Sequence, residues 1–333
     1  VVGINGTALL SGTSTLGANV SLTSNGTFTY DPNVPGSAVQ ALAMGEVATD
    51  SFTYTVSDNA TVDARTDVGN VTITVTGVND TPTATNDAFA TNESGPVITG
   101  NLITDDNGNG VDSDPDVDEN APDDTLSVTE INAAANTGAQ ITLSSGALLT
   151  VNTDTDGSFS YDPNGQFEYL GVGDNFTDTF TYTLADNHGE TDGATVSVVV
   201  SGQNDAPVLT VPGPQSGVIE GSLFDLSTLV SFTDLDLTDS HTITIDWGEG
   251  GATETGTATE TPGSAPATPD TFTLTNTHRF ADDGTYTVTI SVDDGEAGGT
   301  DMGSFTVTVI NAPPMLALNV SPQNEATSFT LTD

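Results

Sequence analysis

The chain of 333 residues contains no cysteine, no lysine and only two arginines, Arg65 and Arg279. Disulfides therefore contribute nothing to its stability, although a secreted, oxidising environment remains compatible with the sequence. Two arginines against 47 acidic residues give a formal net charge of −45, so ion pairs cannot hold the fold together. A chain with this charge is a poor partner for nucleic acid or for an anionic membrane surface.

Long apolar runs are also missing. No stretch of about 18 apolar residues is present, so we predict no membrane insertion in this segment. The first residues, VVGINGT, do not have the pattern of a signal peptide, and any export signal or anchor is expected outside this sequence. Hydrophobic residues make up 35% of the chain, and their regular strand-like patterns argue against disorder.

Internal repetition is the most informative pattern in the sequence. Residues 22–82 and 150–207 share one order: a hairpin, a Tyr-Asp-Pro corner, a Phe-Thr-Tyr-Thr strand, an acidic turn, a long alternating strand and a Gly-x-Asn-Asp-x-Pro motif. In the long strand Val71, Ile73 and Val75 alternate with threonines, and this period of two predicts a half-buried strand. The pattern as a whole predicts antiparallel β-sandwiches in tandem.

A third unit follows and also ends in alternating strands and a proline-rich junction, and the last residues, 315–333, resemble its opening. We therefore predict four segments: 1–81, 82–206, 207–312 and 313–333. The first lacks the N-terminal strand and acidic loop of the second, so we expect the chain to be part of a longer tandem array. An alternative is that a neighbouring molecule supplies the missing strand, as in a donor-strand filament.

The repeated motifs carry a family resemblance. They are GTFTYDP (26–32), DSFTYTVSD (50–58) and GVNDTP (77–82) in the first unit, and DGSFSYDP (156–163), DTFTYTLAD (178–186) and GQNDAP (202–207) in the second. Through these motifs the two units resemble the bacterial cadherin-like and VCBS-type repeats of very large secreted adhesins of the RTX, type I-exported kind. The third unit resembles the PKD domain through IDWGEG (245–250) and HRFADDGTYTVTI (278–290). The resemblance implies an all-β chain of Ig-like or cadherin-like antiparallel β-sandwiches in an elongated array, often stiffened by calcium at the joints.

Residues 105–124 form the most acidic stretch, with nine acidic residues in twenty and no base. Like charges this close repel, so the loop must be splayed in water or must hold hard cations. Calcium takes six to eight oxygen ligands, which clustered Asp and Asn residues supply. One grouping has the spacing of an EF-hand-type loop, although no helices flank it: Asp105, Asn107, Asn109 and Asp116.

A second grouping is cadherin-like and joins the acidic loop to the preceding linker. Its predicted ligands are Asn79, Asp80, Glu93, Asp112, Asp114, Asp116 and Asp118. A solvated acidic loop without a cation is the alternative to both groupings. Asp58 and Asp186 end matching strands, so each is either a further ligand at a joint or a turn residue.

The second linker repeats the order Asn-Asp-x-Pro, then Glu, then Asp-x-Asp. We predict a second calcium site there, from Asn204, Asp205, Glu220, Asp234 and Asp236. The third linker, residues 311–314, has lost the aspartate, and no site is predicted for it.

Other chemistry has little support in the sequence. None of the three histidines has a second histidine or a cysteine nearby to complete a zinc site. Trp247, the only tryptophan, is predicted to be partly buried core rather than a platform for sugar stacking. Nucleophile motifs, HExxH and phosphate loops are absent, so we predict that the chain is not an enzyme.

These features predict a structural repeat segment of a large extracellular bacterial adhesin or surface fibre. The segment would be an elongated stalk, stiffened by calcium at its joints, that serves cell adhesion or biofilm formation in a secreted or surface-attached protein. Its partners would be neighbouring repeats of the same chain, with like chains in a fibre or surface glycans as further candidates. The alternatives are a carbohydrate-binding or accessory module of a secreted enzyme, and a subunit of a donor-strand extracellular filament.

Overall fold

A computed structural model describes residues 1–5, 9–58, 60–116, 125–153, 157–265 and 268–314. All regular secondary structure in these ranges is β-strand, which confirms the predicted fold class. No helix long and apolar enough to cross a membrane occurs in the described ranges. The chain forms two compact units, Val1–Gln203 and Asn204–Asp333.

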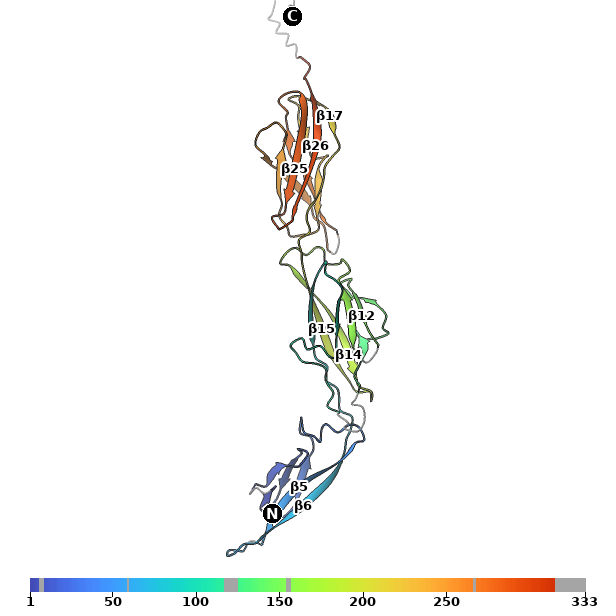
Figure 1. The fold of residues 1–333 in the computed structure, drawn as a ribbon, viewed down its shortest axis with the longest axis vertical. Helices are drawn as coiled ribbons and strands as arrows, with labels where there is room; N and C mark the ends of the chain where they lie inside the picture. The colour runs from blue at the N-terminus through green and yellow to red at the C-terminus, as the bar shows by residue number, and fades with distance from the viewer. Residues whose placement is uncertain (6–8, 59, 117–124, 154–156, 266–267, 315–333) are drawn as a thin grey trace, which may run out of the picture. The chain divides into compact units, whose positions relative to one another are not determined.

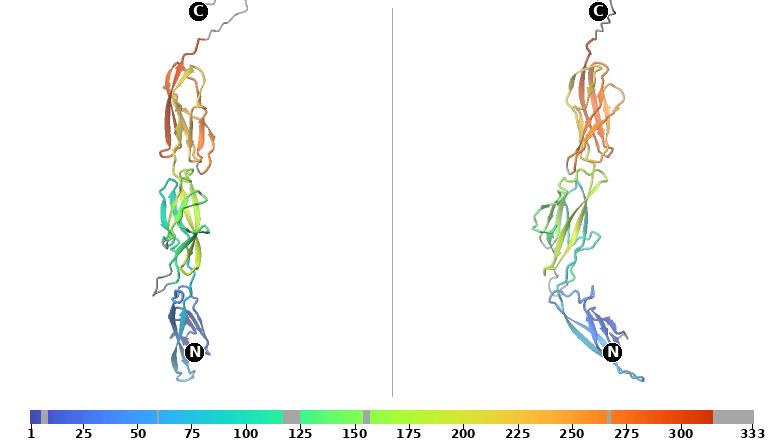
Figure 2. Two further views of the ribbon diagram at one scale, coloured as in Figure 1. Left: turned by 90° about the vertical axis from the view of Figure 1, so that its right-hand side faces the viewer. Right: turned by 180° about the vertical axis from the view of Figure 1, so that it is seen from behind.

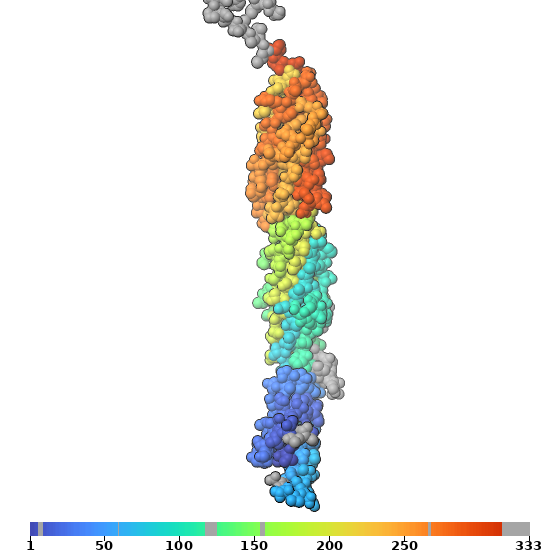
Figure 3. Space-filling model, turned by 90° about the vertical axis from the view of Figure 1, so that its left-hand side faces the viewer, coloured from blue at the N-terminus to red at the C-terminus, as the bar shows by residue number. Residues whose placement is uncertain are grey.

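The first sandwich lies in unit 1 and consists of two three-stranded sheets with the orders β1-β5-β6 and β2-β3-β4 (Figure 1). Its strands are β1 (Gly3–Ile4), β2 (Ser11–Thr13), β3 (Asn19–Leu22), β4 (Phe28–Asp31), β5 (Val47–Ser57) and β6 (Thr66–Thr76). The core between the sheets is small: Ile4, Val20, Leu22 and Phe52. In the space-filling view, the light-blue end of the β5–β6 hairpin extends beyond the dark-blue strands (Figure 3).

The second sandwich, also in unit 1, has sheets of five and four strands with the orders β10-β9-β14-β15-β7 and β11-β12-β13-β8 (Figure 1, Figure 2). Its strands are β7 (Asp87–Asn92), β8 (Ile98–Asn101), β9 (Ser127–Ile131), β10 (Ala134–Ala135), β11 (Ile141–Thr142), β12 (Leu148–Val151), β13 (Ser158–Asp162), β14 (Asn175–Ala185) and β15 (Thr191–Ser201). The predicted alternation fills the core from both long strands: Phe180, Tyr182, Leu184, Val196, Val198 and Val200 are all at most 2% exposed.

Unit 2 contains the third sandwich, with sheets β16-β19-β23-β22 and β17-β26-β25-β20-β21 and the short pair β18-β24. Its strands are β16 (Val208–Thr210), β17 (Gln215–Ile219), β18 (Phe224–Asp225), β19 (Ser231–Asp234), β20 (Thr242–Asp246), β21 (Glu254–Thr255), β22 (Ala258–Thr261), β23 (Asp270–Leu274), β24 (Thr277–His278), β25 (Gly284–Asp293) and β26 (Thr300–Ile310). Trp247 belongs to the core, as predicted: it is 6% exposed, stacks on His278 and donates a hydrogen bond to Glu254. A side chain this buried offers no flat surface to a sugar.

The strand ladders are antiparallel with two exceptions among the described strands. β7 runs parallel to β15 in the second sandwich, and β17 runs parallel to β26 in the third. In both sandwiches an early strand therefore lies beside the last long strand and points the same way. The two strands of each parallel pair therefore end at the same end of their sandwich. The chain passes into the next linker from this end.

A buried carboxylate links the two sheets in each of the first two sandwiches. Asp50 is fully buried and accepts hydrogen bonds from Ser14, from Thr15 Oγ1 at 2.7 Å and from Tyr30 Oη at 2.7 Å. The second sandwich repeats this arrangement with Asp178, Ser145 (2.5 Å) and Tyr161 (3.0 Å). The tyrosine comes from the Tyr-Asp-Pro corner and the aspartate from the start of the Phe-Thr-Tyr-Thr strand, so this network explains why both motifs recur.

The Asp50 network determines the charge state of its carboxyl group. Burial by itself raises the pKa of Asp50, but hydrogen bonds from Ser14, Tyr30, the Leu16 amide and Thr15 outweigh burial and lower that pKa to about 2. An Asp pKa in an unfolded chain is about 3.9. The network therefore stabilises the first sandwich above about pH 4, and this contribution is lost as the pH falls towards 2.

We predict that Asp50→Asn destabilises the first sandwich by about 1–3 kcal/mol at neutral pH, because buried donors lose a charged acceptor. Asp67→Asn is the matched control, since Asp67 is exposed on β6. Calorimetric unfolding of both variants measures the difference, which should shrink at about pH 2–3. Equal unfolding temperatures for the two variants at neutral pH would contradict the role of the network.

Candidate metal centres

A glycine without room for a side chain opens each Gly-x-Asn-Asp linker. The Gly77 amide donates to Glu46 O at 2.8 Å, and a Cβ at this position would lie 2.2 Å from Ala43 O. Gly202 repeats this contact with Asp174 O at 2.9 Å, and a Cβ there would lie 2.1 Å from Gly171 O. Both glycines hold the end of the last strand against the loop before the Phe-Thr-Tyr-Thr strand, and so fix where each linker starts.

The first linker is bound to the second sandwich through the Asp-x-Asp pair of the acidic loop. The Asp80 amide donates to Asp116 Oδ2 at 2.7 Å, and the Asp116 amide donates to Asp114 Oδ1 at 3.0 Å. Asp116 is 1% exposed, so its carboxylate is taken out of water at the linker. Three of the predicted ligands, Asp80, Asp114 and Asp116, are thus neighbours in the structure.

Asp186 joins this group from the end of β14. Asn79 Nδ2 donates to Asp186 Oδ2 at 2.9 Å, while the amides of His188 and Glu190 donate to Asp186 Oδ1 at 2.8 and 3.0 Å. Burial raises the pKa of Asp186, but the hydrogen bonds from Asn79 and the turn amides outweigh it and lower that pKa. Asn79 Oδ1 is buried and has no hydrogen-bond partner among the described residues. Asp58, at the matching position of the first sandwich, is exposed and only accepts bonds from turn amides.

The other predicted ligands of the acidic loop lie apart from this group. Asp112 is 6% exposed and accepts hydrogen bonds from the Thr85 amide (2.7 Å) and from Tyr182 Oη (2.9 Å). Burial raises the pKa of Asp112 despite these bonds. Asn109 Nδ2 donates to the Asn86 carbonyl at 2.9 Å. Asp118 lies outside the described residues.

Asp87, on β7, is a buried acid that the sequence reasoning missed. It is 3% exposed and accepts a hydrogen bond from Asn107 Nδ2 at 3.3 Å. Burial, together with the nearby charges of Asp112 and Asp105, raises the pKa of Asp87 to about 6. Asp105 Oδ2 also accepts a bond from the Asn101 amide at 2.8 Å. Because the side chains of the EF-hand-type grouping have these different partners, the structure does not form that grouping.

The second linker repeats the backbone contacts of the first. The Asp205 amide donates to Asp236 Oδ2 at 2.8 Å, and the Asp236 amide donates to Asp234 Oδ1 at 3.0 Å. Asp234 and Asp236 are only 2% and 1% exposed. The predicted ligands Asp205, Asp234 and Asp236 are therefore brought together at the start of unit 2, next to Asn204.

Two further aspartates complete this cluster. One carboxylate oxygen from each of Asp234, Asp239 and Asp294 lies within 4.8 Å of the other two. Asp294 follows β25 as Asp186 follows β14, so the repeat pattern carried a signal for it. Asp239 lies three residues after Asp236, and no motif in the sequence marked it as a possible ligand.

The cluster contains more buried negative charge than the described chain neutralises. Four of its carboxylate oxygens are buried and have no hydrogen-bond partner among the described residues: Asp205 Oδ2, Asp236 Oδ1, Asp239 Oδ2 and Asp294 Oδ2. Burial first, then the neighbouring carboxylates, raises the pKa of Asp236 to about 7 and that of Asp239 to about 6. Oxygen atoms that point into a buried group without a donor fit a hard divalent cation.

His241, the residue before β20, contacts the cluster. Its Nε2 lies 2.8 Å from Asp234 Oδ2, and its ring packs against Phe232 and Phe272 at centroid distances of 4.9 and 4.7 Å. This packing fixes the imidazole, which in turn orients the Asp234 carboxylate. In the sequence, His241 had no second histidine or cysteine nearby and so gave no sign of this contact.

The predicted grouping of Glu93 and Glu220 with the linkers before them is wrong. Glu93 is 2% exposed, and its Oε1 accepts a bond from the Gln203 amide at 2.6 Å, beyond the end of β15. Asp186 precedes the other end of β15, about 30 Å away at strand spacing. The parallel pairing of β7 with β15 explains this position, because Glu93 directly follows β7 and so lies beside the linker that comes after its sandwich.

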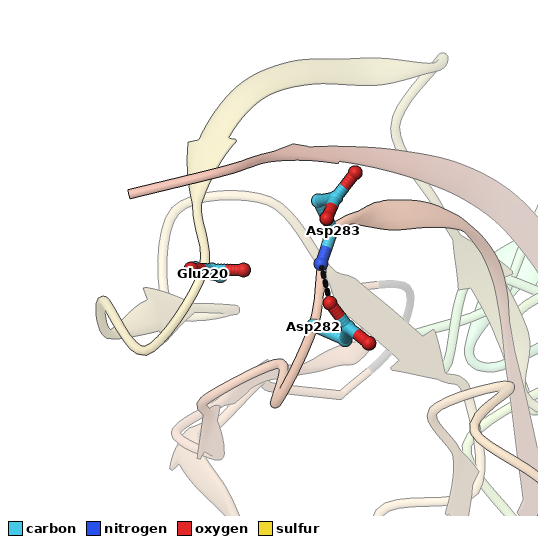
Figure 4. Close-up of side chains that lie close together, drawn as sticks. All are labelled: Glu220, Asp282 and Asp283. Carbon is cyan, nitrogen blue, oxygen red and sulfur yellow. Dashed lines mark hydrogen bonds between the residues drawn. The ribbon is translucent and has the colours of Figure 1, made fainter. Parts of the chain in front are cut away.

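Glu220 follows β17 in the same way. Its amide donates to Ile310 O at 3.0 Å, and its carboxylate lies near those of Asp282 and Asp283 (Figure 4). Asp282 and Asp283 precede β25, whereas Asp294, which is grouped with Asp234, follows the other end of that strand. Asp282 and Asp283 are exposed, so this group is much better solvated than the cluster around Asp236.

The second sandwich is similar to a known domain family. Residues 79–202 match the model of the bacterial cadherin-like domain. Among solved structures, the chain is similar to protocadherin gamma B2 extracellular cadherin domains 1–5, with 13% identity and a TM-score of 0.45 over 89% of this chain and 51% of that chain. It is also similar to mouse cadherin-23 EC22–24, with 16% identity and a TM-score of 0.37 over 88% of this chain and 82% of that chain. This chain thus spans about half the length of the protocadherin structure.

Part of the chain is also similar to the PKD domain of an M14-like peptidase from a Thermoplasmatales archaeon. The identity is 27% and the TM-score is 0.22, over 32% of this chain and 97% of that domain. No curated protein sequence shows a significant match. The similarity to a known family is thus that of residues 79–202 to the bacterial cadherin-like domain, within a chain built of β-sandwiches.

Proposed function

We propose that this chain is a structural segment of an extracellular bacterial adhesin or surface fibre, in which calcium fixes each linker to the sandwich that follows it. The observation that carries the proposal is the group of buried, unpartnered carboxylate oxygens at the second linker. The match of residues 79–202 to the bacterial cadherin-like domain supports the extracellular, adhesive role. Biofilm formation is the setting we favour for such a segment.

The second linker offers the fuller ligand set. Asp205, Asp234, Asp236, Asp239 and Asp294 would hold the ion, with Asn204 Oδ1, which is buried and has no hydrogen-bond partner among the described residues, as a neutral ligand. Calcium supplies positive charge to carboxylates that otherwise repel each other by about 4 kcal/mol per pair at 4 Å and an effective dielectric of 20. Since Asn204 and Asp205 belong to the linker itself, binding would fix the linker to the start of the sandwich.

At the first linker the corresponding ligands would be Asn79, Asp114, Asp116 and Asp186. The two sites share the Asp-x-Asp pair and the backbone bond from the linker aspartate. Extracellular calcium modules bind at about 10⁻⁴–10⁻³ M, so ordinary environmental calcium would fill such sites. A role in holding surface glycans has no comparable support, because Trp247 is buried.

We predict that Asp236→Asn weakens calcium binding to unit 2 by at least about tenfold, since it removes charge from a 1%-exposed ligand. The matched control is Asp246→Asn, because Asp246 is exposed and its carboxylate accepts a hydrogen bond from the nearby Gly248 amide. Isothermal titration calorimetry of the calcium-free chain measures the number and affinity of the sites. If Asp236→Asn keeps the full number of ions at unchanged affinity, the proposed site does not exist.

The raised pKa values of Asp236 and Asp239 predict that, without calcium, the folded state of unit 2 becomes less stable as the pH rises. Their pKa values of about 7 and about 6 exceed the unfolded value of about 3.9, so the folded state favours the protonated acids. Stability from this source is complete below about pH 4 and is lost as the pH rises through about 6–7. Calcium binds the ionised acids and should remove this loss.

Urea unfolding followed by Trp247 fluorescence tests this prediction, since the single tryptophan lies in the core of unit 2. In EGTA the midpoint should be higher at about pH 5 than at about pH 8, and calcium should raise the midpoint most at the higher pH. If the urea midpoint measured in EGTA rises with pH instead, burial of the ionised carboxylates does not destabilise unit 2.

A further inference from the structure

A group of buried acids lies inside the second sandwich, between β7 and the loop that follows β8. Asp87, on β7, is 3% exposed, and its Oδ2 atom is buried and has no hydrogen-bond partner among the described residues. Its other oxygen, Oδ1, has a long contact of 3.3 Å with Nδ2 of Asn107 in the loop. A buried carboxylate oxygen without a donor costs free energy unless a proton or a cation compensates it.

Two further carboxylates act on Asp87. Asp112 is 6% exposed, and its two oxygens accept bonds from the Thr85 amide and from Tyr182 Oη. Asp105 is half-buried near the start of the loop. Burial first, and then the charges of Asp112 and Asp105, raise the pKa of Asp87 to about 6. Above about pH 6 the ionised Asp87 therefore needs positive charge from another group.

The chain has few bases that could supply this charge. It contains no lysine, and its two arginines, Arg65 and Arg279, lie outside the strands of the second sandwich, which run from residue 87 to residue 201. Arg65 precedes β6, and the 11 residues of that strand separate it from the first linker. The one histidine of the second sandwich, His188, lies in the turn after β14. A cation from solution is thus the available source of charge at neutral pH.

The start of the loop places the Asp105 carboxylate against β8. Asp105 Oδ2 accepts a hydrogen bond from the Asn101 amide at 2.8 Å. A Cβ at Gly100 would lie 3.1 Å from the same oxygen, so a glycine at this position leaves room for the carboxylate. This contact turns the loop back towards the strand on which it follows.

The later part of the loop contacts the residues directly before Asp87. Asn109 Nδ2 donates to the Asn86 carbonyl at 2.9 Å, and Thr85 Oγ1 donates to the Gly110 carbonyl at 3.1 Å. Residues 105–112 are therefore held beside the start of β7, with the unpartnered oxygen of Asp87 on the strand and further oxygen ligands in the loop.

We propose that the second sandwich has an internal calcium site in which Asp87 and Asp105 bind the ion through their carboxylates and Asn107 binds it through its side-chain oxygen. Rotation of the Asn107 amide by a half-turn exchanges its nitrogen and oxygen, and the oxygen is favoured beside Asp87 only when a cation is present. Calcium accepts carboxylate and amide oxygens together with water in a flexible geometry. The bound ion would fix the loop to β7. This grouping differs from the EF-hand-type one, because it includes Asp87.

The internal site is separate from the first linker. Asp87 pairs with Val196, and the start of β15 at Thr191 lies five residues earlier, about 17 Å away at strand spacing. Asp186, a ligand proposed for the linker, precedes that start of β15. The two sites share no residue, so each can be removed without the other, and the internal site does not depend on the proposed function.

Hydrogen exchange of the full chain at about pH 8, in calcium and in EGTA, tests the proposal. An ion that binds only the closed loop stabilises it by RT ln(1 + [L]/Kd), so calcium at about ten times its Kd should slow exchange of the amides of residues 105–110 about tenfold. Asp87→Asn should abolish this slowing. Glu130→Gln is the matched control, since Glu130 is exposed on β9, and it should behave like the unmodified chain.

Asp116→Asn separates the internal site from the linker site, because it removes a linker ligand and should leave the calcium effect on residues 105–110 unchanged. Loss of the effect in Asp116→Asn would show that the linker site controls the loop, and would overturn the proposal. So would exchange in the unmodified chain that does not respond to calcium, or a calcium effect that survives Asp87→Asn. If Asp87→Asn loses the protection of β14 and β15 in EGTA and so fails to fold, Asp105→Asn, at a half-buried position, decides by the same criteria.

Discussion

Buried negative charge beside the linkers, in a chain with no lysine and only two arginines, is the constraint on which this structure depends. Asp116 and Asp236 are each 1% exposed and each accept a bond from the linker aspartate's amide. The chain has no lysine, and Arg279 donates to the carbonyl of Gly221 instead. His241 contacts Asp234, and protons or a cation from solution can neutralise the remaining carboxylates. Calcium suits the oxygen-rich clusters at neutral pH.

The local structure around each linker serves this arrangement. Gly77 and Gly202 have no space for a Cβ, so each holds the end of the last strand against a neighbouring loop at the point where the linker starts. The Asp-x-Asp pair then meets the linker amide through the same two backbone bonds in both sandwiches. The interior network of Asp50 and its counterpart Asp178 differs, because hydroxyl donors satisfy those carboxylates without any ion.

The strands, the sandwich class and the Asp-x-Asp pairs could be predicted from the sequence, because alternation and repeated motifs are local signals. The sequence did not contain the direction in which β7 and β17 pair, and this direction decides that Glu93 and Glu220 lie beyond the far ends of their sandwiches. Asp294 joins Asp234 only through tertiary packing, because 60 residues of chain separate them in the sequence.

Small-angle scattering of the full chain with calcium and then with EGTA tests most directly whether calcium at the linkers holds the sandwiches in a fixed arrangement. We predict that chelation changes the maximum dimension and gives the scattering profile of a flexible chain, and that added calcium restores the original curve. With calcium present, the scattering curve of Asp236→Asn should lie between the curves of the unmodified chain in calcium and in EGTA. Identical curves in calcium and in EGTA would contradict the account.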